Sequence, residues 1–540
     1  MNVLFALYGG AGSNSFAPAL QHAIELSRRG HRCAVAVPEG ENEVSGGVRT
    51  LPYADALDDP GAVFGDPGAA DVILGWTPRE VVRRFVTIHQ ARRPTPWVMY
   101  LEDNEDWIAR QALSMVGLHE GILLQHSDEV ISTWTPAGLS HVLHYRDFIG
   151  LADGAVVIQD KLRADVPPWV PCSTVHPGVD LEAFRPMAPD SALRERLGLA
   201  PGERVLAYPG GLNDFTRPGL EALCRAVHLI NESGTPCRLV RTGPVALDFL
   251  DRLPAGAASH VLDLGVVARG ELPALLALAD VLVQPGRRDA FDDLRLPGKL
   301  PEFFASGRPV VLPAANIAEL LRDGEEAVLL EEGSPEEIAD KCLALFADPA
   351  RARRIGEGGR RFAERHFDPA SQSAKLEAAL RRAVEGFDPA RARALWPVDG
   401  GAEFPALRLS RRLELLAAAP GAAGTPAAGY LTELAATKRR AHDRERGLET
   451  GLAVRDADLA RYPGEVARLQ AALAERRVAA DTLDRAVKVL QGEVSLRDAT
   501  IQSLREEAVR QDSRLAALEA SLSWRITAPL RWLLKRLGGR

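Results

Sequence analysis

Short apolar runs alternate with amphipathic stretches over the first part of the chain. Runs of about four to eight apolar residues, bounded by turn residues, are typical of buried strands in parallel sheets. The stretches between them repeat apolar residues at helical spacing. The pattern therefore predicts an α/β fold with two Rossmann-like domains. The predicted strands lie at 2–8, 33–38, 71–76, 97–101, 151–158, 204–209, 239–243, 279–284, 309–313 and 327–330.

The apolar pattern changes to a seven-residue repeat from Pro463 onward. Apolar residues occupy the a and d positions up to Leu522, interrupted only by Arg476, Arg497 and Gln511. Such a stripe predicts a long α-helical coiled coil within residues 431–522. Self-association through this coiled coil is the expected use. A long helix packed on its own globular body is the alternative.

Two shorter segments flank the coiled coil. Residues 386–430 are rich in Ala, Pro and Gly, which predicts a linker. Residues 523–540 interleave Trp524 and Trp532 with arginine and lysine, and they are too short to span a bilayer. This tail predicts binding to an anionic membrane surface, with docking on another protein as the alternative.

Charge and cysteine content narrow the class of protein. The net charge of −8 over 540 residues gives no indication of nucleic-acid binding. The five cysteines are scattered without a CxxC pair, which argues against a zinc site or a disulfide framework. The first residues lack a basic segment and predict a strand instead of a signal peptide. These features favour the cytoplasm, with the tail on the inner face of the membrane.

Residues 286–316 carry the most chemistry in the chain. A loop follows the strand at 279–284 and leads into a short helix that begins near Lys299 and ends at Gly307. Arg295 and Lys299 beside a helix start favour an anion, and the carboxylate of Glu302 can accept hydrogen bonds from a pair of sugar hydroxyls. Pyrophosphate with ribose is one ligand that needs all of these groups. An ordinary solvated helix start is the alternative.

Two glycine-rich turns follow predicted strands. The first contains Gly10 and Gly12 and has Ser15 where a dinucleotide-binding motif has its third glycine, so it indicates that motif only weakly. The second contains Gly211 and allows a ligand close to the backbone. Arg217 and Arg241 lie near the second turn and are candidate phosphate contacts, with surface positions as the alternative.

A cluster of carboxylates, Glu102 to Asp106, follows the predicted strand at 97–101. The carboxyl ends of strands are where α/β folds place their ligands. Glu102 and Asp103 are therefore candidate catalytic residues that position or deprotonate an acceptor hydroxyl. A solvated acidic loop is the alternative.

Two stretches resemble a known family. Residues 299–311 are similar to the second half of the E-x7-E region of retaining glycosyltransferases with the GT-B fold, the family-4 or group 1 type. Residues 174–186 resemble the interdomain signature of the same family. The resemblance spans about residues 1–385, with an acceptor domain at 1–185 and a donor domain at 186–385.

The resemblance implies roles for individual residues. Glu302 matches the glutamate that binds the nucleotide ribose, whereas Leu294 occupies the position of the first glutamate, for which Asp292 or Asp293 is a substitute. Lys299, Arg241 and Arg217 would neutralise phosphate charge, because the family's Gly-Arg pair is absent. The site residues expected to bind the donor are Gly10, Gly12, Gly211, Arg217, Arg241, Arg295, Lys299 and Glu302.

The expected function is transfer of a sugar from a nucleotide-diphosphate sugar to a hydroxyl of a glycan or lipid-linked acceptor, in bacterial surface polysaccharide synthesis. The family implies retention of configuration, with no cofactor and no metal. One alternative is a degenerate GT-B module that acts as a coiled-coil scaffold in a membrane-associated complex. Another is an epimerase or phosphorylase of the same fold.

Overall fold

The structure is a computed structural model of the whole chain. It describes residues 1–40, 43–59, 63–64, 68–115, 135–212, 216–244, 249–253, 256–396, 405–417, 425 and 428–440. The chain divides into two units, Met1–Glu449 and Thr450–Arg540, and every described residue lies in the first. The predicted tail and nearly all of the predicted coiled coil lie outside the described residues. Both stay predictions.

The first half of the unit is built on an eight-stranded sheet with the order β3-β4-β2-β1-β5-β6-β7-β8. All neighbouring strands are parallel except β3 and β4. Residues 3–7 of β1 are at most 1% exposed, as expected for the centre of a sheet covered on both faces. The strands are β1 (Asn2–Leu7), β2 (Arg32–Val37), β3 (Glu43–Ser45), β4 (Val48–Pro52), β5 (Val72–Trp76), β6 (Trp97–Leu101), β7 (Gly154–Val157) and β8 (Cys172–Thr174).

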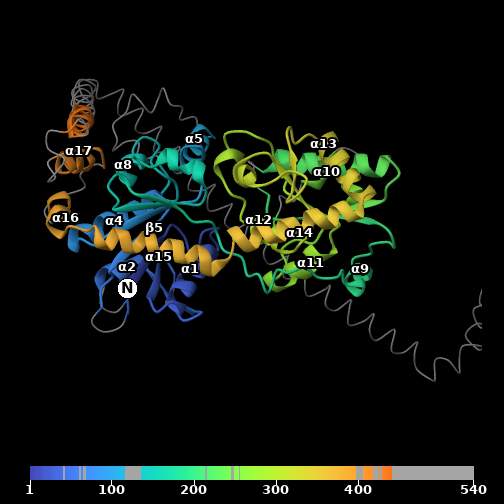
Figure 1. Ribbon diagram of the computed structural model, residues 1–540, viewed down its shortest axis with the longest axis horizontal. Coiled ribbons are helices and arrows are strands. Elements are labelled where there is room, and N and C mark those ends of the chain that lie inside the picture. The colour runs from blue at the N-terminus through green and yellow to red at the C-terminus, as the bar shows by residue number, and fades with distance from the viewer. Residues whose placement is uncertain are drawn as a thin grey trace, which may run out of the picture. The chain divides into compact units, whose positions relative to one another are not determined.

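Helices from both ends of the described chain cover this sheet (Figure 1). Helix α15 (Pro369–Glu385) lies against β5, β6, β7 and β8 and alongside α1 (Phe16–Arg28), although it follows the second sheet in sequence. The chain thus returns to the first domain after completing the second. The other helices here are α2 (Tyr53–Asp58), α4 (Glu80–Arg92), α5 (Glu105–Met115) and α8 (Tyr145–Ile149), with the 3-10 helix η1 (Asp160–Asp165).

The second domain holds a six-stranded parallel sheet with the order β11-β10-β9-β12-β13-β14. Its strands are β9 (Arg204–Pro209), β10 (Cys237–Thr242), β11 (Val261–Asp263), β12 (Val281–Val283), β13 (Val310–Pro313) and β14 (Val328–Leu330). Its α-helices are α9 (Ser191–Arg196), α10 (Arg217–Glu232), α11 (Leu272–Leu278), α12 (Leu300–Ala305), α13 (Pro335–Ala347) and α14 (Pro349–His366). Its 3-10 helices are η2 (Leu250–Arg252), η3 (Ala258–His260), η4 (Arg269–Glu271), η5 (Asp292–Leu294) and η6 (Asn316–Leu320).

Helix α10 shows how the sequence pattern produces this packing. Its buried residues recur every three or four positions, which places them on one face. They pack in the core beside β9 and β10, and α13 covers the same side. The buried residues are Leu220, Leu223, Cys224, Ala226, Val227 and Ile230.

The segment 386–430, expected to be a linker, contains helices instead. Helices α16 (Pro389–Leu395) and α17 (Pro405–Ala417) contact one another, and α17 contacts α8 of the first domain. Leu395, Trp396 and Leu413 are at most 4% exposed. In the described parts of the segment these apolar residues are spaced to bury together on helices, which the Ala, Pro and Gly content alone did not indicate.

Residues 428–440 form a further helix, which includes the first positions of the predicted coiled coil. Lys438 forms an ion pair with Asp147 of α8, so this helix lies on the first domain. Among the residues that the structure describes, none of the helices is long and apolar enough to cross a bilayer.

Candidate active site

The carboxyl ends of the two sheets are tied together by contacts to one loop, residues 286–296, which follows β12. Asn104, after β6, donates from Nδ2 to the carbonyl oxygen of Ala290 at 2.9 Å. Lys161, after β7, lies 2.7 Å from Asp293 Oδ1, and Gln159 donates to the Asp293 carbonyl at 3.1 Å. Because α/β folds bind ligands at the carboxyl ends of their strands, this region is the candidate active site.

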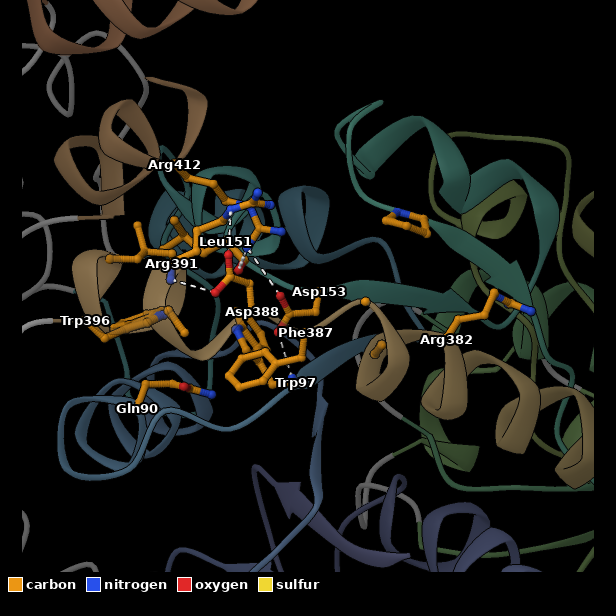
Figure 2. Close-up of a pocket in the computed structure, with 15 residues that line it drawn as sticks. Gln90, Trp97, Leu151, Asp153, Arg382, Phe387, Asp388, Arg391, Trp396 and Arg412 are labelled. Carbon is orange, nitrogen blue, oxygen red and sulfur yellow. Dashed lines mark hydrogen bonds and ion pairs between the residues drawn. The ribbon is translucent and has the colours of Figure 1, made fainter. Parts of the chain in front are cut away.

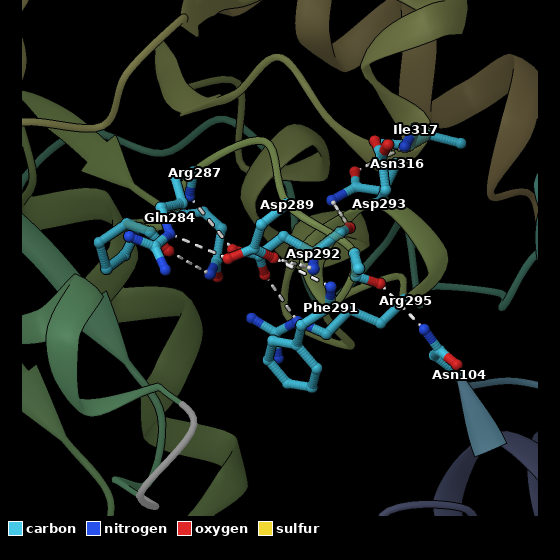
Figure 3. A network of polar contacts seen from close by, with 12 residues as sticks. Asn104, Gln284, Arg287, Asp289, Phe291, Asp292, Asp293, Arg295, Asn316 and Ile317 are labelled. Atoms are coloured by element: carbon cyan, nitrogen blue, oxygen red, sulfur yellow. Dashed lines mark hydrogen bonds and ion pairs between the residues drawn. The ribbon is translucent and has the colours of Figure 1, made fainter. Parts of the chain in front are cut away.

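The loop is held in shape by its own carboxylates (Figure 3). Asp289 Oδ1 accepts hydrogen bonds from the backbone N–H groups of Phe291 and Asp292, at 3.0 and 2.9 Å. Asp292 accepts from the backbone of Arg287 at 3.2 Å and from Arg295 Nε at 2.8 Å. The predicted donor-binding residue Arg295 therefore lies in this loop and is partnered by Asp292.

Leu294 occupies the position where the family has its first glutamate, and its half-buried side chain packs on the hydrophobic core. The two aspartates suggested as substitutes both have protein partners. Asp292 is 7% exposed and binds Arg295, while Asp293 binds Lys161. Asp292 remains the closer substitute, since its carboxylate lies inside the loop beside Gly286.

Lys299 lies at the start of α12 with its ammonium over the end of β9. Its Nζ is 4.1 Å from the centre of the Tyr208 ring, a cation–π contact. A Cβ added to Gly210 would lie 2.5 Å from Nζ, so only glycine leaves room for the lysine there. The structure thus places the ammonium of Lys299 beside Gly210, at the end of β9.

Glu302 lies one turn after Lys299 and is 8% exposed. Its Oε1 accepts a hydrogen bond from Arg269 Nη2 at 2.8 Å. Burial raises the pKa of Glu302, and the nearby cations Arg269 and Lys299 act in the opposite direction. Arg269 is mostly exposed at its side chain and was not among the predicted site residues.

Arg241, predicted to contact a phosphate, has protein groups as its observed partners. Its side chain is 0% exposed, forms an ion pair with Asp263 at 2.8 Å, and donates to the carbonyls of Thr242 and Gly243 at 2.8 and 2.6 Å. A further bond at 3.3 Å reaches the Gly210 carbonyl. The guanidinium thus fastens the turns after β9 and β10 from within the fold. It faces protein carbonyls, so we do not keep it among the phosphate contacts.

The remaining donor-side candidates surround the start of α10. Arg217 is the first residue of this helix and is half-buried. Gly219, in the first turn, approaches the backbone of Pro285 and Gly286 so closely that an added Cβ would lie 3.3 Å from it. Gly211 lies against Pro244. The start of a 16-residue helix next to a glycine turn is a suitable place for an anion.

The two catalytic candidates at the end of β6 differ in their surroundings. Glu102 accepts hydrogen bonds from Ser15 at Oε1 and from Trp76 Nε1 at Oε2, the latter at 2.5 Å. Asp103 has a buried Oδ1 without a hydrogen-bond partner. Glu102 thus joins β6 to the glycine turn and to β5, whereas one buried carboxylate oxygen of Asp103 has no hydrogen-bond partner.

The charges around Asp103 also act on its pKa. Burial raises the pKa of Asp103 to about 7, the charges of Glu105 and Glu102 add to this rise, and Arg79 and Arg295 oppose it. Arg79 is 8% exposed, lies 3.3 Å from Glu105 and stacks over Tyr8. Asp103 is thus poised between its acid and carboxylate forms near neutral pH, as a group that exchanges protons requires.

The turn after β1 is open on the side of Gly10 and Gly12. A Cβ added to either glycine would meet no atom within 4 Å. Ser13 donates from its backbone to the Gly10 carbonyl at 2.8 Å, and α1 begins at Phe16. The turn is linked to the acidic strand end through Ser15 and Glu102.

Several residues of this region were missed by sequence reasoning. Asn104, Gln159, Lys161 and Arg79 carry no motif, and their partners are distant in sequence. The one available signal was their position directly after a predicted strand. Within the described ranges, no group of three His, Cys, Asp or Glu side chains could hold a metal ion.

Residues 203–348, most of the second domain, match the family model of the glycosyl transferases group 1. The D-inositol 3-phosphate glycosyltransferase of Streptomyces bingchenggensis is 28% identical over 255 residues, 43% of this chain and 53% of the relative. The putative glycosyltransferase EpsD of Bacillus subtilis is 30% identical over 193 residues, 35% of this chain and 49% of the relative. The chain spans about half the length of these curated relatives.

The two-domain fold is similar to that of HepE from Anabaena, solved in complex with UDP and glucose. The TM-score is 0.54 at 15% identity, over 71% of this chain and 99% of HepE. The fold is therefore GT-B, as the resemblance predicted, and the match to the group 1 family supports that assignment for the second domain. The family-4 subtype stays a prediction.

Proposed function

We propose that this protein is a glycosyltransferase that moves a sugar from a nucleotide-diphosphate sugar to an acceptor hydroxyl. The observation that carries the proposal is the arrangement of Lys299 and Glu302. They lie one turn apart at the start of α12, with the lysine over the glycine pair that ends β9. This arrangement lies in the domain that matches the group 1 family.

The donor would be bound by the second domain. The diphosphate would lie over Gly210 and Gly211, between Lys299 and the start of α10 with Arg217. Glu302 would accept hydrogen bonds from the ribose hydroxyls in place of the hydrogen bond that it now accepts from Arg269. The solved structure of HepE contains UDP and glucose, which makes a UDP-sugar the first donor to test.

The leaving diphosphate would be stabilised by protein groups. Departure of the nucleotide places negative charge on the phosphate oxygens, and a fixed cation with backbone N–H groups offsets that charge without rearranging. Lys299 supplies the cation here. We propose that no metal is required because protein groups offset this charge, and we propose retention of configuration from the resemblance to the family alone.

The acceptor would meet the first domain at Asp103. Its unpartnered oxygen can accept a hydrogen bond from the attacking hydroxyl, and its raised pKa allows it to take the proton. Glu102 would position this strand end through Ser15 and Trp76. The acceptor class we propose is a bacterial surface glycan or its lipid-linked precursor, reached through the basic tail at the inner membrane face.

The test is a transfer assay with the full chain. UDP-, GDP- and ADP-sugars are offered with a panel of sugar and lipid-linked acceptors, and the glycoside and the free nucleotide are both quantified. We expect one donor to give a product that Lys299→Ala loses, while Lys375→Ala, at an exposed position on α15, retains it. If Lys299→Ala forms the product as well as Lys375→Ala does, Lys299 is not part of the site.

A second candidate is supported by Leu294 and its surroundings. An apolar residue replaces the family's first glutamate, and both nearby aspartates are bound to protein cations. A GT-B module that has lost its donor site, and that serves as a scaffold through its coiled coil, fits these facts. Such a module need not bind any nucleotide, so nucleotide binding separates the two.

A further inference from the structure

A cavity of about 180 Å³ lies at the opposite edge of the first sheet, away from the candidate active site (Figure 2). It opens at the amino ends of three strands. Trp97 is the first residue of β6, Asp153 directly precedes β7, and Pro171 directly precedes β8. Nothing in the proposed sugar transfer uses this edge.

Two distant parts of the chain form the walls. Gln90, Trp97 and Leu151 come from the first domain. The opposing wall comes from the end of α15 and from α16 and α17, the helices that replaced the expected linker. Its members are Gly386, Phe387, Asp388, Arg391, Leu395, Trp396 and Arg412.

Arg412 brings a largely buried cation into this cavity, with Asp153 as its nearest carboxylate. One nitrogen, Nη1, donates to the Leu151 carbonyl and lies 3.9 Å from Asp153, beyond direct hydrogen-bond range. Its Nε is buried without a hydrogen-bond partner. The other oxygen of Asp153, Oδ2, accepts the backbone N–H of Trp97 at 3.0 Å.

Arg391 adds a second cation on the same wall. Its Nε lies 3.8 Å from the carboxylate of Asp388, which already caps α16 by accepting the backbone N–H groups of Ala390 and Arg391. Both arginines line the cavity, and burial lowers the pKa of Arg412, the charge of Asp153 opposes this fall, and repulsion from Arg391 adds to it. An anion between them would relieve that repulsion.

Aromatic rings form the rest of the lining. Trp97 is 1% exposed, and its indole Nε1 is a buried donor without a partner. Trp396 is 2% exposed and is held in place by Arg408, whose guanidinium lies 4.7 Å from its ring. Phe387 is the third aromatic residue in the lining. The cavity thus combines hydrogen-bond donors with aromatic surface.

We propose that this cavity binds a small organic anion with a flat apolar body. Its carboxylate or phosphate would accept hydrogen bonds from Arg412 and Arg391, and its body would pack against Trp97, Phe387 and Trp396. A cavity of about 150 Å³ holds benzene, so a ring with one anionic group fits the available volume. Because both walls contact it, the ligand would fasten α16 and α17 to the first domain.

The experiment measures binding of phenyl phosphate and benzoate to the full chain by titration calorimetry. Benzyl alcohol and inorganic phosphate are the controls that lack the charge and the ring. Three proteins are compared: wild type, Arg391→Gln and Lys299→Ala. The glutamine keeps the backbone N–H that caps α16, and the lysine variant reports binding at the donor site. Limited proteolysis by thermolysin follows cleavage within α16 and α17.

We expect phenyl phosphate, benzoate or both to saturate one site more tightly than either control. Arg391→Gln should weaken this binding at least tenfold, whereas Lys299→Ala should leave it unchanged, and the ligand should slow cleavage within α16 and α17. The affinities for phenyl phosphate and benzoate show whether the site prefers a phosphate or a carboxylate. No saturable binding at millimolar concentration, or binding lost in Lys299→Ala and kept in Arg391→Gln, would overturn the proposal.

Discussion

The ammonium of Lys299 lies 4.1 Å from the centre of the Tyr208 ring and fills the space that a side chain at residue 210 would occupy. These two residues come from the start of α12 and the end of β9, 91 positions apart in the numbering. Tyr208 is 1% exposed, so its ring is a fixed support for the cation. The lysine is thereby held above the glycine pair before any ligand arrives, which reduces the cost of positioning it.

Gly210→Ala tests this arrangement without removing the lysine. The new methyl group would lie 2.5 Å from Lys299 Nζ, so the flexible side chain must move aside. Because Gly210 has a φ of 157°, alanine there also strains the backbone and should lower the melting temperature. We expect the affinity for the nucleotide to fall about tenfold, measured by calorimetry. Gly40→Ala is the matched control, because Gly40 has a φ of 147° and an added Cβ would meet only Val37 Cγ2, at 3.6 Å. Equal affinity in both variants would show that the lysine position is unimportant.

Asp103→Asn should change how stability depends on pH. The folded-state pKa of Asp103 is about 7, above its ordinary value of 3.8, so the folded protein holds this proton more tightly than the unfolded chain. Asp103 therefore costs stability increasingly as the pH rises from about 4 to about 7. We expect the asparagine variant to be more stable than wild type at pH 8, on the order of 2 kcal/mol, and equally stable near pH 4. Chemical denaturation of both proteins at several pH values measures this difference in the free energy of unfolding.

The same titration has a consequence for turnover. If the carboxylate form of Asp103 accepts the proton of the acceptor hydroxyl, kcat/KM should rise with pH and level off above about 7. In Asp103→Asn the rate should be lower and the rise should disappear. A rise that persists in the variant would assign the proton transfer to another group.

Arg241→Met should destabilise the second domain instead of acting on the chemistry alone. The change leaves Asp263 and three backbone carbonyls without their donor. Breaking a buried ion pair from one side costs about 3 kcal/mol or more. Chemical denaturation of the variant measures this loss. A variant of unchanged stability that binds nucleotide more weakly would instead restore Arg241 to the list of phosphate contacts.

Lys161→Met should loosen the loop at 286–296 while leaving the overall fold stable. Lys161 lies 2.7 Å from Asp293 and 2.9 Å from Glu319, and all three side chains are partly exposed, so the ion pairs contribute less than about 1 kcal/mol. We expect faster amide hydrogen exchange within the loop and a melting temperature close to that of wild type. Lys375→Ala serves again as the control. Unchanged exchange in the loop would show that Gln159 and Asn104 hold it without the lysine.

The apolar pattern predicted ten strands and missed β3, β4, β8 and β11, which are only three to five residues long and contain few apolar residues. Apolar runs marked the positions of β1, β5, β6 and β12, and Lys299 and Glu302 followed from a helix start with its charges. Arg241 was misplaced because a charged residue near a strand end looks the same whether it faces a ligand or its own carbonyls. Its partners Asp263 and Gly210 lie 22 and 31 positions away, and no local pattern encodes such pairings.

The sequence marks the start of α16, although the Ala, Pro and Gly content of residues 386–430 predicted a linker there. Asp348, Asp368 and Asp388 each precede a proline and each accept a backbone N–H in the first turn of a helix, namely α14, α15 and α16. Aspartate followed by proline is a strong helix start. The same Asp-Pro pair at Asp388 marked α16 inside the segment expected to be a linker, although Asp-Pro also occurs at Asp59 and Asp66.

The most direct test of the central claim, a nucleotide-sugar site in the second domain, is a thermal-shift panel on the full chain. UDP, GDP, ADP and their sugars are compared on wild type and Glu302→Ala. We predict that one nucleotide raises the melting temperature, by an amount equivalent to about 2.7 kcal/mol at 100 times its dissociation constant, and that Glu302→Ala loses most of this shift. A folded wild type that is stabilised by none of these nucleotides would contradict the claim and favour the scaffold.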